Sequence, residues 1–417
     1  MSYTSYINRE IENAILSASQ NYPVVMVCGQ RQVGKSTMLQ HLMPEGMTRV
    51  TFQNNNMRHL AETDPDFFFD TYKPPILIDE FQYVPSILSK IKCIIDDRDA
   101  ANIPSNGLFW LTGSQRFSMM KGASETLVGR VRCFELSTLS SVELDGRNPG
   151  IFHPDIDSLR ERTKNVRPQD VHDIFDKIFI GGMPKIIDAG MYKNKTDREG
   201  YYADYVDLYL EKDIHLLSQV GDLGLFYKLL VLMAANTGQL LNVDLISKKL
   251  GIAYHTAERW ISILERSGVI RLVEPYYSNI LQRMIKSPKV YFMDTGLACY
   301  LGKWTDPRTL EEGNMAGHMF ETYVVSEILK SYMNNGSRSQ LYFYRDYDKK
   351  EVDLLIVEGD TIYPIEVKKG ETPEDAKKNL VPLLNSAYHI MPEIIICNVS
   401  EFMPYDRNTW LFPVAAL

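Results

Sequence analysis

Short, wholly apolar runs separated by helix-forming segments dominate the first third of the chain. Residues 24–28, 76–78 and 108–111 are apolar at almost every position, which is typical of strands buried on both faces of a parallel sheet. The segment 49–53 predicts a further short strand, which we expect between the two strands whose ends handle phosphate in this sheet. The pattern therefore predicts an α/β domain over residues 1–150.

Helical periodicity replaces this pattern after the loop at residues 145–150. Residues 171–179 and the aromatic-rich stretch 201–217 predict helices, which we assign to a helical lid over residues 151–230. Two glycines and a proline at residues 181–184 predict a sharp helix stop between them.

A helix–turn–helix pattern follows from Val243. A helix ends at Gly251, and a second helix over 254–266 places Ala257, Ile261 and Leu264 on one face. Strand-like runs at 269–273 and 289–292 complete the pattern of a winged helix, which we assign to residues 231–316. A helix and a strand pair then predict a fourth domain over residues 317–417.

Composition and charge restrict the class of protein. The chain has 417 residues, 45% of them hydrophobic, which suffices for several cored domains. It contains no apolar run of membrane-spanning length and no signal-peptide core at its start, so we expect a cytoplasmic protein without a membrane partner. The five cysteines are scattered, which indicates neither a disulfide framework nor a zinc site.

The clearest chemical motif is a G-x-x-x-x-G-K-S sequence directly after the first apolar run. In such a loop, glycines let backbone N–H groups turn toward phosphates, the lysine reaches the β/γ oxygens, and the serine holds Mg²⁺. The motif predicts ATP and Mg²⁺ as cofactors. The residues that we expect to bind the nucleotide are Gly29, Gln30, Arg31, Gln32, Val33, Gly34, Lys35, Ser36 and Thr37.

Two acids at the end of the second apolar run predict what happens to the nucleotide. Asp79 is the expected Mg²⁺ partner of Ser36, and Glu80 is placed to orient and deprotonate an attacking water. This arrangement favours hydrolysis over transfer to a substrate, so the predicted enzyme is an ATPase. Lys35 is expected to take part in catalysis as well as in binding.

Two further residues are candidates for sensing or stabilising the γ-phosphate. Ser114 follows the third apolar run and is the candidate sensor. Arg130, next to Gly129, is the candidate arginine finger, acting on the nucleotide of its own chain or of a neighbouring subunit in an oligomer. A solvated surface arginine is the alternative at this position.

Taken together, these motifs resemble a known family. The stretches 29–36, 76–85, 111–114 and 127–131, with later ones such as 181–184 and 290–297, resemble the predicted AAA+ type ATPases of bacteria and archaea that carry a C-terminal domain of unknown function. The resemblance covers residues 23–370. It implies an ATPase core, a helical lid, a winged helix and a nuclease-like fold, but no biological task.

The predicted winged helix leaves its own role open. Residues 231–316 hold 10 Lys and Arg against 8 Asp and Glu, a net charge of only +2. Glu258 and Glu265 lie on the helix that would read DNA. DNA reading and a structural role against the ATPase core are therefore both compatible with the sequence.

The last domain holds a second group of charged residues. If Gly359-Asp360 forms a two-residue hairpin loop, the numbers of paired residues sum to 719, which sets Asp353 opposite Glu366 and Glu351 opposite Lys368. Facing acids destabilise a sheet, so a divalent cation, Mg²⁺ or Mn²⁺, is the expected compensation. Glu321 on a preceding helix could complete this cluster, whereas Glu327 points to another face.

This pattern of Glu321, Asp353, Glu366 and Lys368 resembles the restriction-endonuclease-like PD-(D/E)xK fold. The resemblance implies that the three acids bind metal and that Lys368 acts in catalysis. Against cleavage stands the net charge of residues 317–417, which is −5, from 10 Lys and Arg against 15 Asp and Glu. Such a charge is unfavourable for holding a polyanion.

Two functions remain open from the sequence. One is an ATPase that couples turnover to nucleic-acid binding or metal-dependent cleavage. The other is a nucleotide-switched protein-interaction module, in which the nuclease-like domain is vestigial. The overall charge of −8 favours the second, and the complete set of acids with Lys368 favours the first.

Overall fold

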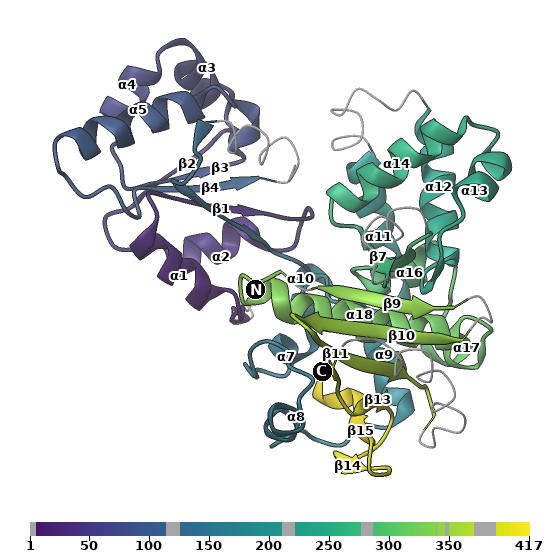
Figure 1. Cartoon of the computed structure of the whole chain (residues 1–417). Helices are drawn as coiled ribbons and strands as arrows, with labels where there is room; N and C mark the ends of the chain where they lie inside the picture. The colour runs from purple at the N-terminus through teal and green to yellow at the C-terminus, as the bar shows by residue number, and fades with distance from the viewer. Residues whose placement is uncertain are drawn as a thin grey trace.

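Two bodies of secondary structure meet around the long helix α18 (Ala316–Asn334) in the computed structural model (Figure 1). The structure describes residues 6–113, 126–210, 222–276, 287–338, 340–346, 350–370 and 389–417. The first body is an α/β unit made by the N-terminal third of the chain. The second body contains the remaining helices and a larger sheet.

The first body is built on a five-stranded sheet in which all pairings are parallel. The strand order is β2-β3-β4-β1-β5. The strands are β1 (Val24–Cys28), β2 (Thr48–Thr51), β3 (Ile76–Asp79), β4 (Phe109–Gly113) and β5 (Val131–Glu135). This arrangement confirms the predicted α/β class for the N-terminal domain.

One detail of that sheet corrects the sequence prediction. The strand between the two phosphate-handling strands, β1 and β3, is β4, whereas the strand near residue 50 lies at the sheet edge. Burial explains the difference, because every residue of β4 is buried, while β2 has the polar sequence Thr-Arg-Val-Thr and only Val50 is buried. Fully apolar strands occupy the centre of a parallel sheet.

Helices cover both faces of this sheet. One apolar cluster lies on the side of α3 to α5 and another on the side of α1 and α2. The helices of this body are α1 (Glu12–Asn21), α2 (Lys35–Leu42), α3 (Asn55–Thr63), α4 (Pro65–Thr71) and α5 (Ile87–Ala100).

The second body is built on a ten-stranded sheet with the order β14-β15-β13-β11-β10-β9-β7-β8-β6, in which β12 pairs with β11. Its strands are β6 (Gln239–Leu240), β7 (Ile270–Pro275), β8 (Lys289–Phe292), β9 (Leu341–Arg345), β10 (Glu351–Glu358), β11 (Thr361–Val367), β12 (His389–Ile390), β13 (Glu393–Cys397), β14 (Met403–Pro404) and β15 (Thr409–Pro413). Strand β7 pairs in parallel with β9, so one sheet runs across the boundary expected near residue 316.

The second body contains helices where the sequence predicted them, and it contains further helices besides. They are α7 (Ser141–Leu144), α8 (Ile156–Arg162), α9 (Val171–Ile180), α10 (Pro184–Asp188), α11 (Lys195–Leu208), α12 (Leu223–Ala235), α13 (Val243–Leu250), α14 (Tyr254–Arg266), α16 (Thr295–Leu301), α17 (Pro307–Glu312) and α18. The predicted ones are α9, α11, α13, α14 and α18, although residues 211–217 of the predicted helix 201–217 lie outside the described residues. We call residues 243–292 the α13–β8 unit, because α13 and α14 are followed there by the antiparallel pair β7 and β8. None of the described helices is long and apolar enough to cross a bilayer.

The helices assigned to the predicted lid pack in two different places. Helices α8 and α9 belong to the core of the second body, where Phe152 packs edge-on against Phe412, and Phe175 stacks on Phe320. Their apolar faces are buried in this core, so these two helices do not cover the first body (Figure 1). Among the described helices of residues 151–230, α10 and α11 line the cavity over the phosphate loop.

Buried polar side chains join the two bodies. Arg9 forms an ion pair of 3.0 Å with Glu143 and donates hydrogen bonds to the carbonyl oxygens of Val33 and Ser137, both at 2.9 Å. Burial raises the pKa of the adjacent Glu10 carboxyl to about 7, and Glu143 adds to this shift. The N-terminal segment thus ties the phosphate loop to the second body.

Candidate functional site

The phosphate loop adopts a conformation that only its sequence permits. Gly29 has φ of +146°, and a Cβ atom there would lie 2.1 Å from the carbonyl oxygen of Leu136. Gly34 has φ of +94° and stands at the N-cap of α2, where L side chains are disfavoured. Both glycines therefore allow the loop to pass from the buried end of β1 into α2, whose free N–H groups favour an anion.

Lys35 stands at the start of α2 and is buried. Its ammonium donates hydrogen bonds to the carbonyl oxygens of Gly29, at 2.9 Å, and of Gln30, at 2.6 Å. These two contacts hold the positive charge inside the phosphate loop. Such a position suits a lysine that binds the β/γ oxygens of a nucleotide.

Ser36 and Asp79 converge as the sequence predicted. The Ser36 hydroxyl donates to Asp79 Oδ1 at 2.7 Å, and Thr112, at the end of β4, donates to the same oxygen at 3.0 Å. The hydroxyl and carboxylate oxygens are hard ligands of the kind that Mg²⁺ prefers. The donor set therefore fits a nucleotide-bound magnesium ion.

Glu80 follows directly in the left-handed region, with φ of +58°. This conformation is uncommon for a residue with a side chain, and it turns Glu80 away from the line of β3. Its carboxylate accepts a hydrogen bond from the Gln82 amide. Glu80 also lines the cavity over the phosphate loop, as a water-activating residue must.

The cavity over the phosphate loop has a volume of about 720 Å³. It is lined by the predicted residues Arg31 to Thr37 and Glu80, and the sequence analysis did not name most of the remaining wall. The additional lining includes Tyr6, Arg9, Gln53, Leu139, Pro184, Lys185, Asp188 and Leu208. Pro184 follows the glycine pair at 181–182, which was the one available signal for this wall.

Arg130 lies at the amino ends of the strands, whereas the phosphate loop lies at their carboxyl ends. Its carbonyl oxygen accepts from the N–H of Val24, the first residue of β1, whereas the loop follows the last residue of that strand. Five strand residues separate the two ends by about 13 Å. Its guanidinium pairs with Asp96, so Arg130 is not a finger for the nucleotide of its own chain. Ser114 lies outside the described residues.

Gln30 connects the phosphate loop to the second body. Its side-chain amide donates to the carbonyl oxygen of Gly268, in the turn between α14 and β7, and accepts from the hydroxyl of Tyr205 at 3.4 Å. Gln30 is buried. Its backbone carbonyl also receives the Lys35 ammonium, so this one residue contacts the phosphate-binding lysine, α11 and the α13–β8 unit.

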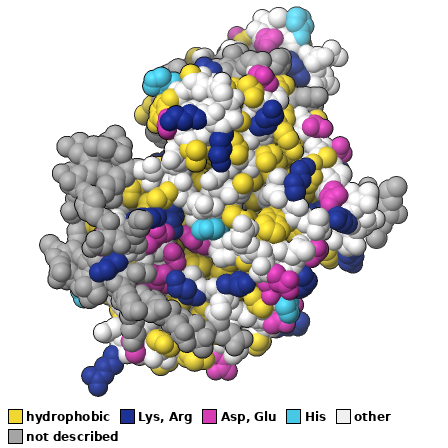
Figure 2. Space-filling model, turned by 90° about the vertical axis from the view of Figure 1, so that its right-hand side faces the viewer, with side chains coloured by type: hydrophobic (Ala, Val, Ile, Leu, Met, Phe, Trp, Pro, Cys, Tyr) yellow, Lys and Arg dark blue, Asp and Glu magenta, His cyan; other side chains and the backbone are white. Residues whose placement is uncertain are grey.

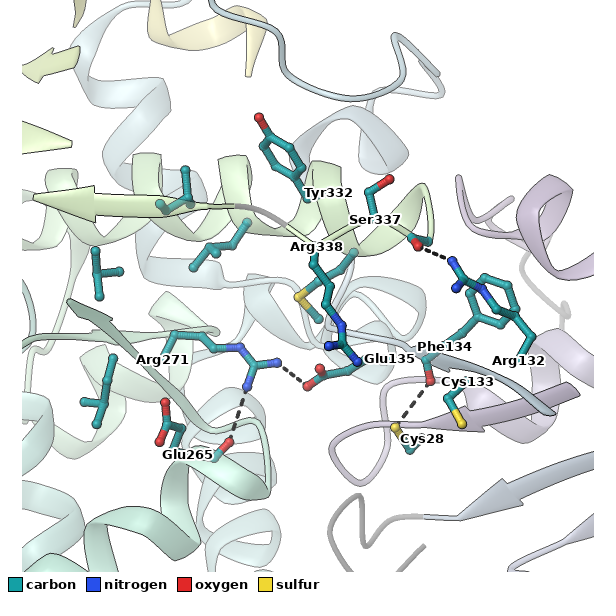
Figure 3. Close-up of a pocket in the computed structure, with 16 residues that line it drawn as sticks. Cys28, Arg132, Cys133, Phe134, Glu135, Glu265, Arg271, Tyr332, Ser337 and Arg338 are labelled. Carbon is teal, nitrogen blue, oxygen red and sulfur yellow. Dashed lines mark hydrogen bonds and ion pairs between the residues drawn. The ribbon is translucent and has the colours of Figure 1, made fainter. Parts of the chain in front are cut away.

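A second cleft, of about 910 Å³, lies beside this connection, between β5, β7 and the end of α18 (Figure 3). Arg271 of β7 pairs with Glu135 of β5, and Arg132 donates to the carbonyl oxygen of Gly336 at 2.6 Å. Polar contacts of this kind across an open cleft make an interface that is easily rearranged.

The C-terminal acids meet at a basic side chain that the sequence did not single out. The hairpin register is confirmed, since Glu358 pairs with Thr361 and Leu354 with Ile365. Between the acids stands Lys289 of β8, whose ammonium lies 2.8 Å from Glu321, 2.5 Å from Glu351 and 3.9 Å from Asp353. The Lys289 side chain is only 3% exposed.

Charges in this cluster shift the proton affinities of its members. Burial raises the pKa of the Glu321 carboxyl, and burial together with Asp353 raises that of Glu366. Burial alone would lower the pKa of Lys289, but Tyr291 and the surrounding acids raise it well above its usual range. The lysine therefore carries a full positive charge inside the cluster.

The described residues give no support to the predicted second metal site. Asp353 lies near both Glu321 and Glu366, and the Lys289 ammonium lies beside Glu321 and Asp353. Among the residues described, no group of three or more such ligands is arranged to hold a metal ion. Lys368, the predicted catalytic lysine, instead pairs with Glu366 at 3.2 Å. Glu327 contacts Ser141 and Lys330, as expected of a separate face.

Comparisons with protein families divide the chain into three matched segments. Residues 21–144 match the AAA domain, residues 171–308 a domain of unknown function (DUF8612), and residues 316–417 a domain of unknown function (DUF4143). The AAA match spans the phosphate loop and supports nucleotide binding and hydrolysis by this domain.

Curated relatives resemble most of the chain. The uncharacterized proteins Rv2008c of Mycobacterium tuberculosis and Mb2031c of Mycobacterium bovis are each 26% identical over 367 residues, which is 88% of this chain and 74% of theirs. Among solved structures, the Walker-type ATPase PABY2304 of Pyrococcus abyssi is 13% identical with a TM-score of 0.44, over 71% of this chain and 96% of that one. A RuvB variant of Thermotoga maritima has a TM-score of 0.30 at 15% identity, over 64% and 89% of the two chains.

Proposed function

The chain combines an AAA domain with a C-terminal domain of unknown function, and from this premise we propose that it is an ATP-driven conformational switch. ATP binding and hydrolysis at the phosphate loop change the contacts between the first body and the second. The C-terminal domain then serves as a protein-interaction module and does not cut nucleic acid.

The residues of the ATPase site have separate tasks in this proposal. Lys35 and the N–H groups at the start of α2 bind the phosphates, and Ser36 with Asp79 would hold Mg²⁺, which neutralises phosphate charge when bound. Glu80 accepts a proton from the attacking water. Its position one residue beyond Asp79 places its carboxylate in the cavity wall beside the phosphate loop.

The observation that carries the switch is the double role of Gln30. Its carbonyl oxygen is held by Lys35, while its amide is held by Gly268 of the α13–β8 unit and by Tyr205 of α11. A nucleotide that draws the Lys35 ammonium toward phosphate removes one of these contacts. Nucleotide binding would therefore change the strength of a hydrogen bond between the two bodies. A switch requires such a contact, one whose free energy differs between the nucleotide-free and nucleotide-bound states.

The position of Lys289 favours the interaction module over the nuclease. A buried ammonium with three acids around it supplies the charge compensation that a divalent cation would supply. Moving the Lys289 ammonium out of this position would leave carboxylates without a positively charged partner, which would destabilise the fold. A metal ion would have to displace a cation that the fold itself provides.

Nucleic acid is the less favoured partner. The exposed face of α13 and α14 carries Lys248, Lys249 and Arg259, but Asp244 and Glu258 lie among them. Figure 2 shows basic side chains scattered among acidic and hydrophobic ones on this side of the described molecule. A surface that binds the phosphate backbone normally presents a continuous basic stripe.

Hydrogen exchange with and without ATP tests the switch. In the Glu80→Gln chain, which should bind ATP without turning it over, we expect ATP to change protection of the backbone around residues 267–269 and in α11. Gln30→Ala in the same background should retain ATP binding and lose most of that change. Lys35→Ala should abolish ATP binding and serve as the control for nucleotide effects.

Unchanged exchange at residues 267–269 in an ATP-bound chain would refute the switch. Incubation of the wild type with labelled single-stranded, duplex and branched DNA and with RNA, in Mg²⁺ or Mn²⁺, tests the alternative. Cutting that disappears in both Asp353→Ala and Lys368→Ala would establish a nuclease and contradict the interaction module.

A further inference from the structure

Asp79 receives hydrogen bonds on both carboxylate oxygens, and the two come from different parts of the site. Oδ1 faces the Ser36 and Thr112 hydroxyls. Oδ2 receives the guanidinium of Arg49 at 3.2 Å. Arg49 is on β2, two residues before Thr51, which pairs with Asp79 across the sheet.

Arg49 is also anchored on the helix that carries the phosphate loop. Its second terminal nitrogen donates to the Gln40 side-chain oxygen at 3.1 Å. Gln40 lies four residues after Ser36 on α2, so both project from the same face of the helix. The guanidinium therefore bridges the strand that carries the magnesium-binding acid and the helix that carries the magnesium-binding hydroxyl.

This geometry separates the arginine from the magnesium position. The serine that would bind the ion points at Oδ1, whereas Arg49 holds Oδ2, so the two do not compete for one oxygen. A carboxylate with one oxygen fixed by a guanidinium has little freedom to rotate. Outer-shell contacts of this kind orient metal ligands and raise their affinity for the ion.

We propose that Arg49 is a positioning residue for the ATPase reaction, because it fixes the Asp79 carboxylate so that Oδ1 faces the nucleotide-bound magnesium ion. The inference rests on the proposed ATPase site and assigns a role to a residue outside its motifs. Arg49 takes no part in binding phosphate in this assignment, which agrees with its place at the edge strand.

The direct test measures Mn²⁺ binding to the full-length Glu80→Gln chain, with protein in excess over ATP. Electron paramagnetic resonance reports the bound Mn²⁺. We expect Arg49→Met to raise the dissociation constant of Mn²⁺ about tenfold, in line with the loss of an outer-shell contact. Arg49→Lys, which keeps the positive charge but on a single nitrogen, should recover part of the affinity. ATP affinity without metal should stay within about twofold of the parent.

Arg98→Met is the matched control, since Arg98 is a partly exposed arginine of the same body whose guanidinium donates to the Pro104 carbonyl oxygen. It should leave Mn²⁺ affinity unchanged.

Equal Mn²⁺ affinity in Arg49→Met and its parent would overturn the inference while leaving the ATPase intact. Absence of any nucleotide-dependent Mn²⁺ site in the parent would overturn the proposed function itself. If Arg49→Met does not fold, Gln40→Ala and Arg49→Lys test the inference in its place. Both should raise the dissociation constant of Mn²⁺ relative to the parent.

Discussion

Two groups of carboxylates among the described residues invite comparison, because each has a basic side chain beside it. At the nucleotide site, Arg49 contacts one oxygen of Asp79, and its side chain is 37% exposed. At the C-terminal cluster, Lys289 contacts Glu321 and Glu351 and lies near Asp353, and its side chain is 3% exposed. The acids look alike in sequence, but the cations stand in different places.

This difference decides which cluster suits a metal. Asp79 keeps an oxygen directed at Ser36, so the arginine supports the ligand without occupying the ion's position. Lys289 lies between the acids themselves and occupies that position. Converging carboxylates are therefore an incomplete sign of a metal site, because the same charge can be compensated by a buried ammonium.

Removal of the lysine should have the largest effect. Lys289→Met leaves Glu321, Glu351 and Asp353 without their buried partner, and we expect a loss of about 3–5 kcal/mol in the free energy of unfolding. Chemical denaturation measures this loss. Lys248→Met is the control, because Lys248 forms an exposed pair with Asp244 and should cost less than about 1 kcal/mol. Equal stability of Lys289→Met and wild type would contradict the role given to this lysine.

A substitution at the nucleotide site should change the ATPase activity and leave the free energy of unfolding unchanged. Glu80→Gln should lower the ATPase rate at least about 100-fold, since general-base catalysis contributes at least that much. ATP binding should persist, because the amide keeps the shape of the side chain. Steady-state hydrolysis and nucleotide titration separate these effects, and a Glu80→Gln chain with normal turnover would remove Glu80 from catalysis.

Part of the pH dependence of stability should come from the C-terminal cluster. Burial raises the folded-state pKa of Glu321 above its ordinary value of 4.5. Its contribution to stability is then complete below pH 4.5 and is lost as pH rises through the folded-state pKa. Between pH 5 and pH 8 the free energy of unfolding should fall more steeply in wild type than in Glu321→Gln, by about 2 kcal/mol. Parallel curves for the two chains would show that Glu321 does not titrate in this way.

Local signals made much of the fold predictable. The phosphate loop, the acids after β3, the α13–α14 pair and the register of the β10–β11 hairpin each depend on short-range spacing, and the structure places them accordingly. Thr112 was within reach of the same reasoning, because it ends a buried strand at the edge where Asp79 lies.

Contacts between distant segments were not predictable. Lys289 lies 32 residues before Glu321 and belongs to a different predicted domain, so no spacing relates them. Arg130 was placed by its glycine neighbour, but the direction of β5 sets it at the amino ends of the strands. The packing of α8 and α9 in the core of the second body could not be predicted either, because an amphipathic helix does not reveal which body it will cover.

The most direct test of this contrast is a Mn²⁺ titration of the full-length chain, with and without ATP, in the wild type and in Asp79→Asn and Asp353→Asn. The account predicts one Mn²⁺ site per chain that requires ATP, is lost in Asp79→Asn and is unchanged in Asp353→Asn. A second Mn²⁺ site that binds without ATP and disappears in Asp353→Asn would contradict the assignment of Lys289 as the cation of the C-terminal cluster.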